Sequence, residues 1–570
     1  MQSQAWMTSG EGHPRRWAIL SVLVVSLLVV VLDNTVLNIA LPTIQADLQA
    51  TQSELVWAID SYILVFASLL FTWGVVGDRV GRKKVLVIGL VIFGVASAVC
   101  AFSVSSGMLI GFRAVMGIGG AAVLPTTLAI ITVVFPPHER GRAIGAWAGA
   151  VGAAVALGPV LGGILLQHPD WSNWLTGNDW GSVFLINVPI VIVGLYFIIR
   201  VVPETRNPHP RRLDVMGLVM SMVGLVLLVY GIIDASSTRD WLAPSVIIPM
   251  VAGIAILSVF LWLEARSDHP SFDVSLFRNR GYAVSLSAVS LAFFAMSGIT
   301  FSLPFYLQVL RGFDTLGAGL CFLPFAIGQL LSAPRSARLV ARFGYRPVMT
   351  TGLVTVSASL LALANLRIDT PLWLVLVVFF FFGLGMGSVI APASTVMQNV
   401  LPLARAGAGS AVQNTVRQVF GALGVAVIGT ILATQYAANL EPVVDRLPPG
   451  LPQGSGEVAS ESIIGTMRVL AVAQQAGVPA DVLAAAQQAA FDAFLAASHV
   501  TSYISFGMVA LAALIVFFRL PLITPPEVGD RAVGAPADPA DALVQEHVEH
   551  YAQEAAEEYP GTQPDPRAAG

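Results

Sequence analysis

Apolar runs long enough to cross a membrane recur along this whole chain and rule out an ordinary soluble core. A helix needs about 20 mostly apolar residues to span about 30 Å of hydrocarbon. Of 570 residues, 56% are hydrophobic and 11% charged, against about 25% charged in a typical soluble domain. The sequence therefore predicts an all-α polytopic membrane protein. Fourteen spans are expected, at residues 17–41, 55–77, 85–104, 107–134, 142–167, 182–200, 213–234, 244–264, 281–308, 316–341, 348–365, 372–398, 409–436 and 498–522.

Basic residues gather in alternate connections between these spans. The connections after even-numbered spans hold Arg79, Arg82, Lys83, Lys84, Arg140, Arg142, Arg206, Arg211, Arg212, Arg266, Arg278, Arg280, Arg335, Arg338, Arg342, Arg346 and Arg405. The opposite connections hold only Arg239, Arg311, Arg367, Arg446 and Arg468. Because Lys and Arg accumulate in cytoplasmic loops, we expect both termini in the cytoplasm. Lysine occurs only at positions 83 and 84 while arginine is abundant, which suggests a bacterial source and hence a bacterial inner membrane.

A diverged internal repeat divides the chain into two halves. The stretch "GVVGDRVGRKK" (74–84) follows span 2, and "ARLVARFGYRP" (337–347) follows span 10, with Ala341 in place of Asp78. Transporters are often built from repeated halves with the substrate site between them. The expected parts are a cytoplasmic N-terminus (1–16), a six-helix bundle (17–200), inserted helices 7 and 8 (201–264), helices 9–13 (265–436), an extracellular loop (437–497), helix 14 (498–522) and a cytoplasmic acidic tail (523–570).

Two segments lie outside the predicted spans. Residues 437–497 contain the Pro/Gly-rich stretch "LPPGLPQGSGE" and then alanine-rich stretches of helical character. A solvated surface loop and a pair of interfacial amphipathic helices both fit this composition. In the tail, His547 and His550 have a metal-like spacing, but an isolated H-x-x-H in a polar segment is typical of solvent-exposed residues.

The turn after span 2 combines glycines with charges at fixed spacing. Gly74 and Gly81 permit close helix approach and a tight reversal, since glycine accepts positive φ without steric strain. Asp78 can accept hydrogen bonds or pair with arginine. The basic residues Arg79, Arg82 and Lys83 would hold the turn at the anionic leaflet. A purely topogenic basic loop is the alternative, but the G-x3-D-R-x-G-R-K spacing favours a structured cytoplasmic gate.

Three ionisable residues lie within predicted spans at similar depth. Counted at 1.5 Å per residue, Asp33 lies roughly 13 Å, Arg113 roughly 10 Å and Asp60 roughly 7 Å from the outer ends. Because charges within membranes face the bundle interior and pair, we expect Asp33 to pair with Arg113. A nearby cation favours the ionised carboxylate while desolvation favours the neutral form, so Asp33 could load and release a proton. A static ion pair between spans 1 and 4 is the alternative.

Two further charged residues have several open interpretations. Asp60, in "WAIDSYILVF", could attract cationic compounds, take part in proton transfer, or be hydrated near a helix end. Arg417, in "NTVRQVFGALG" of span 13, has no acidic residue in the surrounding second-half spans. It could bind backbone carbonyls, substrate, or a carboxylate of the first half.

Span 5 is rich in glycine and contains a proline. Gly145, Gly158, Gly162 and Gly163 allow close helix packing, and Pro159 removes one helical hydrogen bond and favours a bend. A bend among close-packed glycines can act as a hinge or as a seal against leakage. Generic glycine-mediated packing is the alternative.

In combination these stretches resemble the major facilitator superfamily, and within it the fourteen-span drug:proton antiporter family. The G-x3-D-R-x-G-R-K pattern after span 2 resembles the superfamily signature. The stretches "LDNTVLNIALP" (32–42), "RAVMGIGGAA" (113–122) and "ALGPVLGG" (156–163) resemble motifs of spans 1, 4 and 5. "FLINVP" (184–189) and "LPFYLQ" (303–308) are also similar to family stretches. Met116 and Ala154 depart from the family pattern without removing an ionisable group.

The resemblance implies a fold and a set of roles. It implies two six-helix bundles plus two inserted helices, with Asp33 and Arg113 in proton coupling. The candidates for a substrate site or second proton site are Asp60, Asn38, Tyr306, Gln308 and Arg417.

The expected function is proton-coupled export of hydrophobic or cationic compounds, driven by the proton motive force without a cofactor. Proton symport for uptake, or export of a single antibiotic or lipid, remain open. The chain has no G-x4-G-K-[ST] phosphate-binding motif and no H-E-x-x-H motif, so we expect no ATP-driven pump, no metal site and no enzyme. The expected partners are small hydrophobic substrates, protons and the lipid bilayer, with no nucleic acid.

Overall fold

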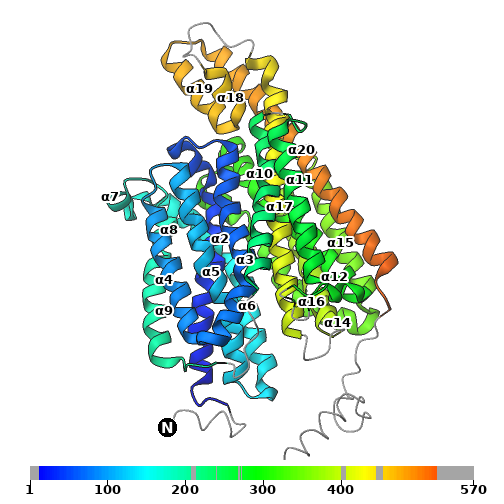
Figure 1. Ribbon diagram of the computed structural model, residues 1–570. Helices are drawn as coiled ribbons and strands as arrows, with labels where there is room; N and C mark the ends of the chain where they lie inside the picture. The colour runs from blue at the N-terminus through cyan, green and yellow to red at the C-terminus, as the bar shows by residue number, and fades with distance from the viewer. Residues whose placement is uncertain are drawn as a thin grey trace, which may run out of the picture. The chain divides into compact units, whose positions relative to one another are not determined.

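The computed structural model describes residues 12–206, 214–238, 240–267, 270, 272–399, 406–444 and 454–522. Within these ranges the regular structure is entirely helical (Figure 1). Thirteen of the helices are long and apolar enough to cross a membrane. The chain is therefore a multi-pass membrane protein.

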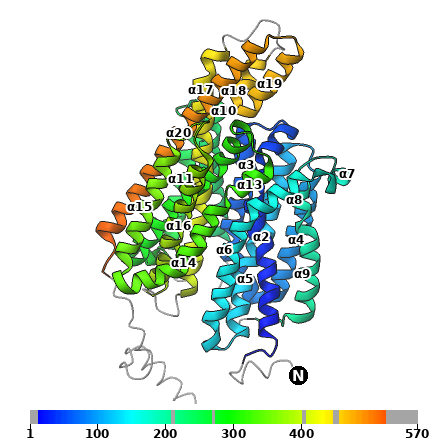
Figure 2. The same ribbon diagram turned by 180° about the vertical axis from the view of Figure 1, so that it is seen from behind.

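Two groups of long helices lie side by side (Figures 1 and 2). The N-terminal bundle comprises α2 (Arg16–Leu48), α3 (Gln52–Val80), α4 (Arg82–Ala101), α5 (Ser106–Val134), α6 (Pro137–Gln167) and α9 (Asn187–Val201). The C-terminal bundle comprises α12 (Arg280–Phe305), α14 (Leu323–Phe343), α15 (Tyr345–Leu363), α16 (Leu372–Asn399), α17 (Ala406–Val444) and α20 (Ala480–Arg519). The inserted pair is α10 (Val215–Thr238) and α11 (Pro244–Glu264). Of this pair, α10 packs against both α3 and α17.

Short elements complete the chain between the long helices. They are η1 (Pro169–Trp171), α7 (Asn173–Thr176), α8 (Ser182–Leu185), η2 (Val274–Arg278), the π-helical turn η3 (Tyr306–Leu310), α13 (Thr315–Leu320), α18 (Ser455–Glu461) and α19 (Ile463–Gln475). The fifth predicted span falls in α6, which begins at Pro137 and whose described apolar part is Leu157–Gln167. The other thirteen predicted spans each coincide with an apolar helix of sufficient length.

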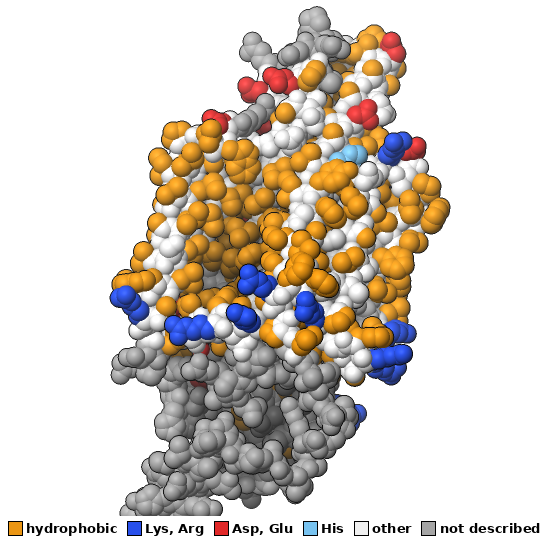
Figure 3. Space-filling model, turned by 90° about the vertical axis from the view of Figure 1, so that its right-hand side faces the viewer, with side chains coloured by type: hydrophobic (Ala, Val, Ile, Leu, Met, Phe, Trp, Pro, Cys, Tyr) orange, Lys and Arg blue, Asp and Glu red, His pale blue; other side chains and the backbone are white. Residues whose placement is uncertain are grey.

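The two ends of the helical unit differ in charge. Figure 3 shows Lys and Arg side chains in a band toward one end and Asp and Glu toward the other. The basic end is where α2 begins and where α3 turns into α4. The acidic end is where α2 ends and α3 begins, with Asp47 and Glu54 beside that connection. That the basic end faces the cytoplasm is a prediction from the sequence.

The segment 437–497 is largely helical and is not an extended loop. Helices α17 and α20 contain 39 and 40 residues, roughly 60 Å at 1.5 Å per residue, twice the hydrocarbon thickness. Their ends at the acidic side join α18 and α19 to form a helical cap, in which Tyr436 hydrogen-bonds Thr466. The helices run beyond the predicted spans, to Val444 in α17 and from Ala480 in α20, because these alanine-rich sequences have high helix propensity.

Candidate functional site

The centre of the N-terminal bundle holds a buried ion pair. Asp33 on α2 is 1% exposed and Arg113 on α5 is 0% exposed. Arg113 donates from Nη1 to Asp33 Oδ2 over 2.5 Å and from Nε to the carbonyl of Ala58 over 3.0 Å. Its guanidinium lies 4.4 Å from the ring centroid of Tyr62, a cation–π arrangement. The expected pairing is therefore present, and it joins α2, α3 and α5.

Two polar residues that the sequence analysis did not single out complete this site. Asn187 on α9 donates from Nδ2 to Asp33 Oδ1 over 2.9 Å and to Ser97 Oγ over 3.0 Å. Ser97 on α4 in turn donates to the carbonyl of Phe184 over 2.9 Å. Each oxygen of Asp33 thus receives a hydrogen bond from a different helix. Asn187 lies in "FLINVP" (184–189), which resembles a family stretch but was assigned no role, and Ser97 is an uncharged polar residue within an apolar span.

Asp60 is also buried but lies on a different face of α3. It follows Val56 by four residues and Trp57 by three, and residues at these spacings share a helix face. A Cβ on Gly429 of α17 would lie 2.6 Å from Val56, and Trp57 packs against Tyr230 of α10. Asp60 therefore faces the junction of α3, α17 and α10, where the two bundles meet.

The side of α3 that contacts Arg113 is nearly opposite. Ala58 and Tyr62 each lie two residues from Asp60, which is about 160° around the helix. Asp60 is 0% exposed, and neither of its carboxylate oxygens has a hydrogen-bond partner among the described residues. The sequence placed all three charged residues at similar depth in the membrane. In the structure, Asp60 lies apart from the Asp33–Arg113 pair.

The other candidates for substrate contact lie near the acidic end. Gln308 donates to the carbonyl of Ile39 over 2.9 Å, a hydrogen bond between the two bundles. Asn38 donates to the carbonyl of Asn34 within its own helix. Both Asn38 and Gln308 are half-buried.

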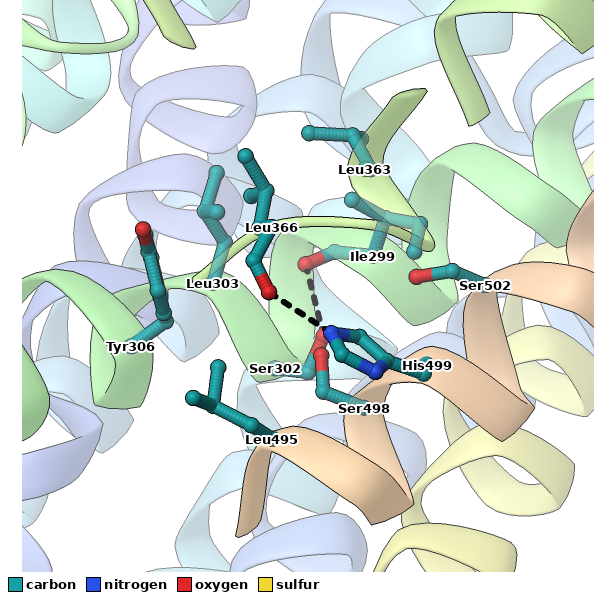
Figure 4. A pocket seen from close by; sticks show the side chains of 10 residues that line it. All are labelled: Ile299, Ser302, Leu303, Tyr306, Leu363, Leu366, Leu495, Ser498, His499 and Ser502. Carbon is teal, nitrogen blue, oxygen red and sulfur yellow. Dashed lines mark hydrogen bonds between the residues drawn. The ribbon is translucent and has the colours of Figure 1, made fainter. Parts of the chain in front are cut away.

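Tyr306 is engaged inside the C-terminal bundle. Its hydroxyl donates to the carbonyl of Arg367 over 2.9 Å and accepts a hydrogen bond from Arg311. It also lines a small pocket between α12, α15 and α20 (Figure 4). In this pocket the ring of His499 hydrogen-bonds the carbonyl of Leu366 over 2.7 Å. The structure thus gives Tyr306 contacts within its own bundle.

Arg417 lies toward the basic half of α17 with few polar contacts. Its guanidinium carbon is 5.0 Å from the centroid of the Phe293 ring on α12. Its Nε is buried and has no hydrogen-bond partner within the described ranges. Contact with an aromatic ring was not among the roles considered for Arg417 from the sequence.

The α3–α4 turn is a structured element tied to the end of α9. Gly81 has φ 125°, a backbone conformation that favours glycine. Arg82 pairs with Asp78 over 2.8 Å and donates to the carbonyl of Ala129. Glu204, after α9, accepts a hydrogen bond from the backbone N–H of Lys83 over 3.1 Å.

Gly74 and Arg79 also belong to this motif. A Cβ on Gly74 would only touch Pro125, at 3.8 Å, and Arg79 is exposed. The sequence analysis missed Glu204, although an acid directly after a span, opposite a basic turn, was a usable signal. These contacts favour a fixed turn over a solely topogenic loop.

The glycines of α6 serve two packing surfaces. Gly158 meets the Thr35 side chain of α2, and a Cβ on Gly162 would lie 3.1 Å from Val36. On the other side, a Cβ on Gly163 would lie 2.6 Å from the carbonyl oxygen of Thr315 on α13. Gly145 also belongs to α6, but its surroundings lie outside the described part of the structure.

Contacts between the two bundles gather at the acidic end. Besides the Gln308 contact, Thr315 donates to the carbonyl of Gly163 and Gln167 donates to Asp314 over 3.1 Å. A Cβ on Gly319 would collide with the carbonyl of Pro159. Arg468 of the cap reaches the carbonyls at the end of α2. These contacts hold the two bundles together at the acidic end.

The described residues contain no group of three or more His, Cys, Asp and Glu that could hold a metal ion. His547 and His550 lie outside the described ranges.

These features define a helical membrane transporter: it has two helical bundles, a charged site inside one of them, and contacts between the bundles at one end. The family model described as Major Facilitator Superfamily matches residues 23–425. The chain belongs to the Major Facilitator Superfamily.

Two relatives and one solved structure illustrate the similarity. The multidrug efflux pump LfrA of Mycolicibacterium smegmatis is 33% identical over 503 residues, covering 88% of this chain and 95% of the relative. The methyl viologen resistance protein SmvA of Salmonella typhimurium is 32% identical over 454 residues, covering 79% and 88%. A bacterial homologue of the human lysosomal transporter Spinster, in an inward-facing and occupied conformation, matches with a TM-score of 0.62. It has 15% identity over 92% of this chain and 99% of that chain, so it shares the fold.

Proposed function

We propose that this protein exports hydrophobic or cationic compounds in exchange for protons. The observation that carries the proposal is the buried Asp33–Arg113 pair in a chain whose relatives include proteins named for multidrug efflux and methyl viologen resistance. Methyl viologen is a flat organic dication, which fits the cationic substrate class. The proton motive force supplies the energy and no cofactor takes part.

The membrane is that of a bacterium, with the basic end and both termini at the cytoplasm. This orientation follows from the positive-inside rule. The closed acidic end then faces outward, and the conformation is one that loads substrate from the cytoplasm. Proton entry requires the acidic end to open, which breaks contacts such as Gln308–Ile39.

The chemistry of Asp33 suits a proton carrier. Arg113 and Asn187 each stabilise the ionised carboxylate, and protonation of Asp33 weakens both hydrogen bonds. One proton moving down about 180 mV supplies roughly 4 kcal/mol. That supports about a thousandfold gradient of an electroneutrally exchanged substrate.

The test is transport in proteoliposomes with an imposed pH gradient and two probes, ethidium and methyl viologen. Wild type should move at least one probe only while the gradient stands, and an ionophore should stop it. Asp33→Asn should bind the probe but lose gradient-driven transport. Ser26→Ala is the matched control, since Ser26 is buried on the same helix and its hydroxyl donates to the carbonyl of Val22.

Either of two results would contradict the proposal. Gradient-driven transport that survives in Asp33→Asn would remove Asp33 from proton coupling. Movement of a probe in the same direction as the protons would indicate symport instead of exchange.

A further inference from the structure

A directional chain of hydrogen bonds ends at Asp33. It begins at the carbonyl of Phe184, which accepts from Ser97 Oγ over 2.9 Å. Ser97 Oγ lies 3.0 Å from Asn187 Nδ2, which also lies 2.9 Å from Asp33 Oδ1. Asn187 is 2% exposed and Ser97 0% exposed, so water does not compete for these groups.

The chain fixes which way the Asn187 amide points. A backbone carbonyl can only accept, so the hydroxyl hydrogen of Ser97 is committed to Phe184. The oxygen of Ser97 must then accept, and only the NH2 group of Asn187 can donate to it. The same NH2 group faces Asp33. Asparagine can present either an oxygen or a nitrogen to a neighbour, and here the network selects the nitrogen.

This orientation distinguishes between the two forms of Asp33. An N–H donor stabilises an ionised carboxylate, whereas a protonated carboxyl at that oxygen needs an acceptor. The other oxygen of Asp33 receives Arg113. In the described structure, the other titratable groups that interact with Asp33 are Tyr62 of α3 and Cys100 of α4.

We propose that Asn187, oriented by Ser97, is a positioning residue that holds Asp33 in its ionised form and sets the pH at which Asp33 takes up a proton. This inference rests on the proposed role of Asp33 in proton exchange. It assigns a coupling role to α4 and α9, which carry no charged residue at this depth. The alternative is that Asn187 and Ser97 only hold α2, α4 and α9 together, as polar groups do in membrane bundles.

The experiment titrates Asp33 directly in purified protein. The infrared absorption of protonated carboxyl groups is recorded against pH in dodecyl maltoside, and the Asp33→Asn spectrum is subtracted to isolate Asp33. Asn187→Leu removes the donor and keeps the number and branching of the side-chain heavy atoms. Ser97→Ala leaves the donor but frees its orientation. Ser26→Ala again serves as the control.

The expected result is a shift of the Asp33 midpoint to higher pH. Loss of a hydrogen bond to a charged group should move it by about one to two pH units in Asn187→Leu. Ser97→Ala should move it in the same direction by a smaller amount, because the amide can still rotate into place. The double variant should shift no further than Asn187→Leu, since the two residues act in series. Ser26→Ala should leave the midpoint unchanged.

The pH profile of gradient-driven ethidium export in proteoliposomes should shift with the infrared midpoint. An unchanged Asp33 midpoint in both Asn187→Leu and Ser97→Ala would overturn the inference. Asn187 and Ser97 would then only hold the helices together. If Asn187→Leu does not fold, the midpoint of Ser97→Ala decides alone. Failure of the proposed function is distinct: transport would then remain coupled in Asp33→Asn, whatever the midpoints of the other variants.

Discussion

Gly163 on α6 offers a sharp test of how the two bundles close. A Cβ at this position would lie 2.6 Å from the carbonyl oxygen of Thr315 and 2.7 Å from the Cα of Leu316. Ordinary contact begins at 3.4 Å, so Gly163→Ala must push α13 away by several tenths of an ångström. Both obstructing atoms are backbone and cannot rotate aside. Overpacking of this kind destabilises an arrangement by about 1–3 kcal/mol.

Because this contact joins the two bundles, the substitution should destabilise the closed arrangement of the acidic end and not the fold of either bundle. A difference of about 1–3 kcal/mol changes the ratio of closed to open forms about 5- to 150-fold. The side chains of Gln167 and Asp314 meet across the same interface at 3.1 Å. Cysteines at these two positions therefore report closure, in a background where Cys100 and Cys321 are replaced.

Gly163→Ala should strongly reduce cross-linking of this cysteine pair by a short bifunctional reagent. Gly111→Ala is the matched control, since a Cβ there meets nothing within 4 Å. Cross-linking of Gly163→Ala at the rate of the parent would refute the argument that backbone contact at Gly163 holds the acidic end closed. A large loss of thermal stability would instead place the strain within the N-terminal bundle.

Three further outcomes are expected. Arg113→Leu should lower stability by about 3–5 kcal/mol because it leaves Asp33 buried and unpaired, and adding Asp33→Asn should recover most of the loss in a thermal melt; no recovery would mean that the charge is not the cause. Glu204→Ala should destabilise the α3–α4 turn by about 1 kcal/mol, because it removes the acceptor of the Lys83 backbone N–H, and amide exchange at Lys83 should become faster; unchanged exchange would mean that Glu204 does not stabilise the turn. Arg468→Ala should lower the same Gln167–Asp314 cross-linking, since it removes hydrogen bonds from the cap to α2; unaltered cross-linking would mean that the cap does not support closure.

The fold was predictable because the bilayer imposes a simple rule on sequence. Every span must be helical and apolar for about 20 residues, so hydropathy locates the helices. Outside the apolar segments the prediction was less definite: helical character was expected in 437–497, but its hydrophobicity does not indicate that α17 and α20 continue into it. Their alanine content carried the signal, but helix propensity alone does not separate a continued helix from a separate one.

The candidate site was predictable only in its charged members. A buried carboxylate or guanidinium has such a high desolvation cost that a partner of opposite charge is expected, which leads from Asp33 to Arg113. Asn187 and Ser97 carry no such cost, and uncharged polar residues are common in membrane helices. Their role depends on which helix faces share an interior, which requires the three-dimensional packing.

Two motifs that the sequence presents separately are joined in the structure. Asp33 is two residues from Thr35, and the Thr35 side chain packs against Gly158 of α6. The next residue, Pro159, presents its carbonyl to Gly319 of the C-terminal bundle. The path from the buried carboxylate to the contact between bundles thus runs through one turn of α2 and one of α6. At the first contact the β-branched Thr35 side chain lies against the backbone of Gly158, and at the second the backbone of Pro159 lies against Gly319. Because Thr35 has few rotamers and neither glycine has a side chain, we expect a shift of α2 at Asp33 to reach the closed end with little side-chain relaxation.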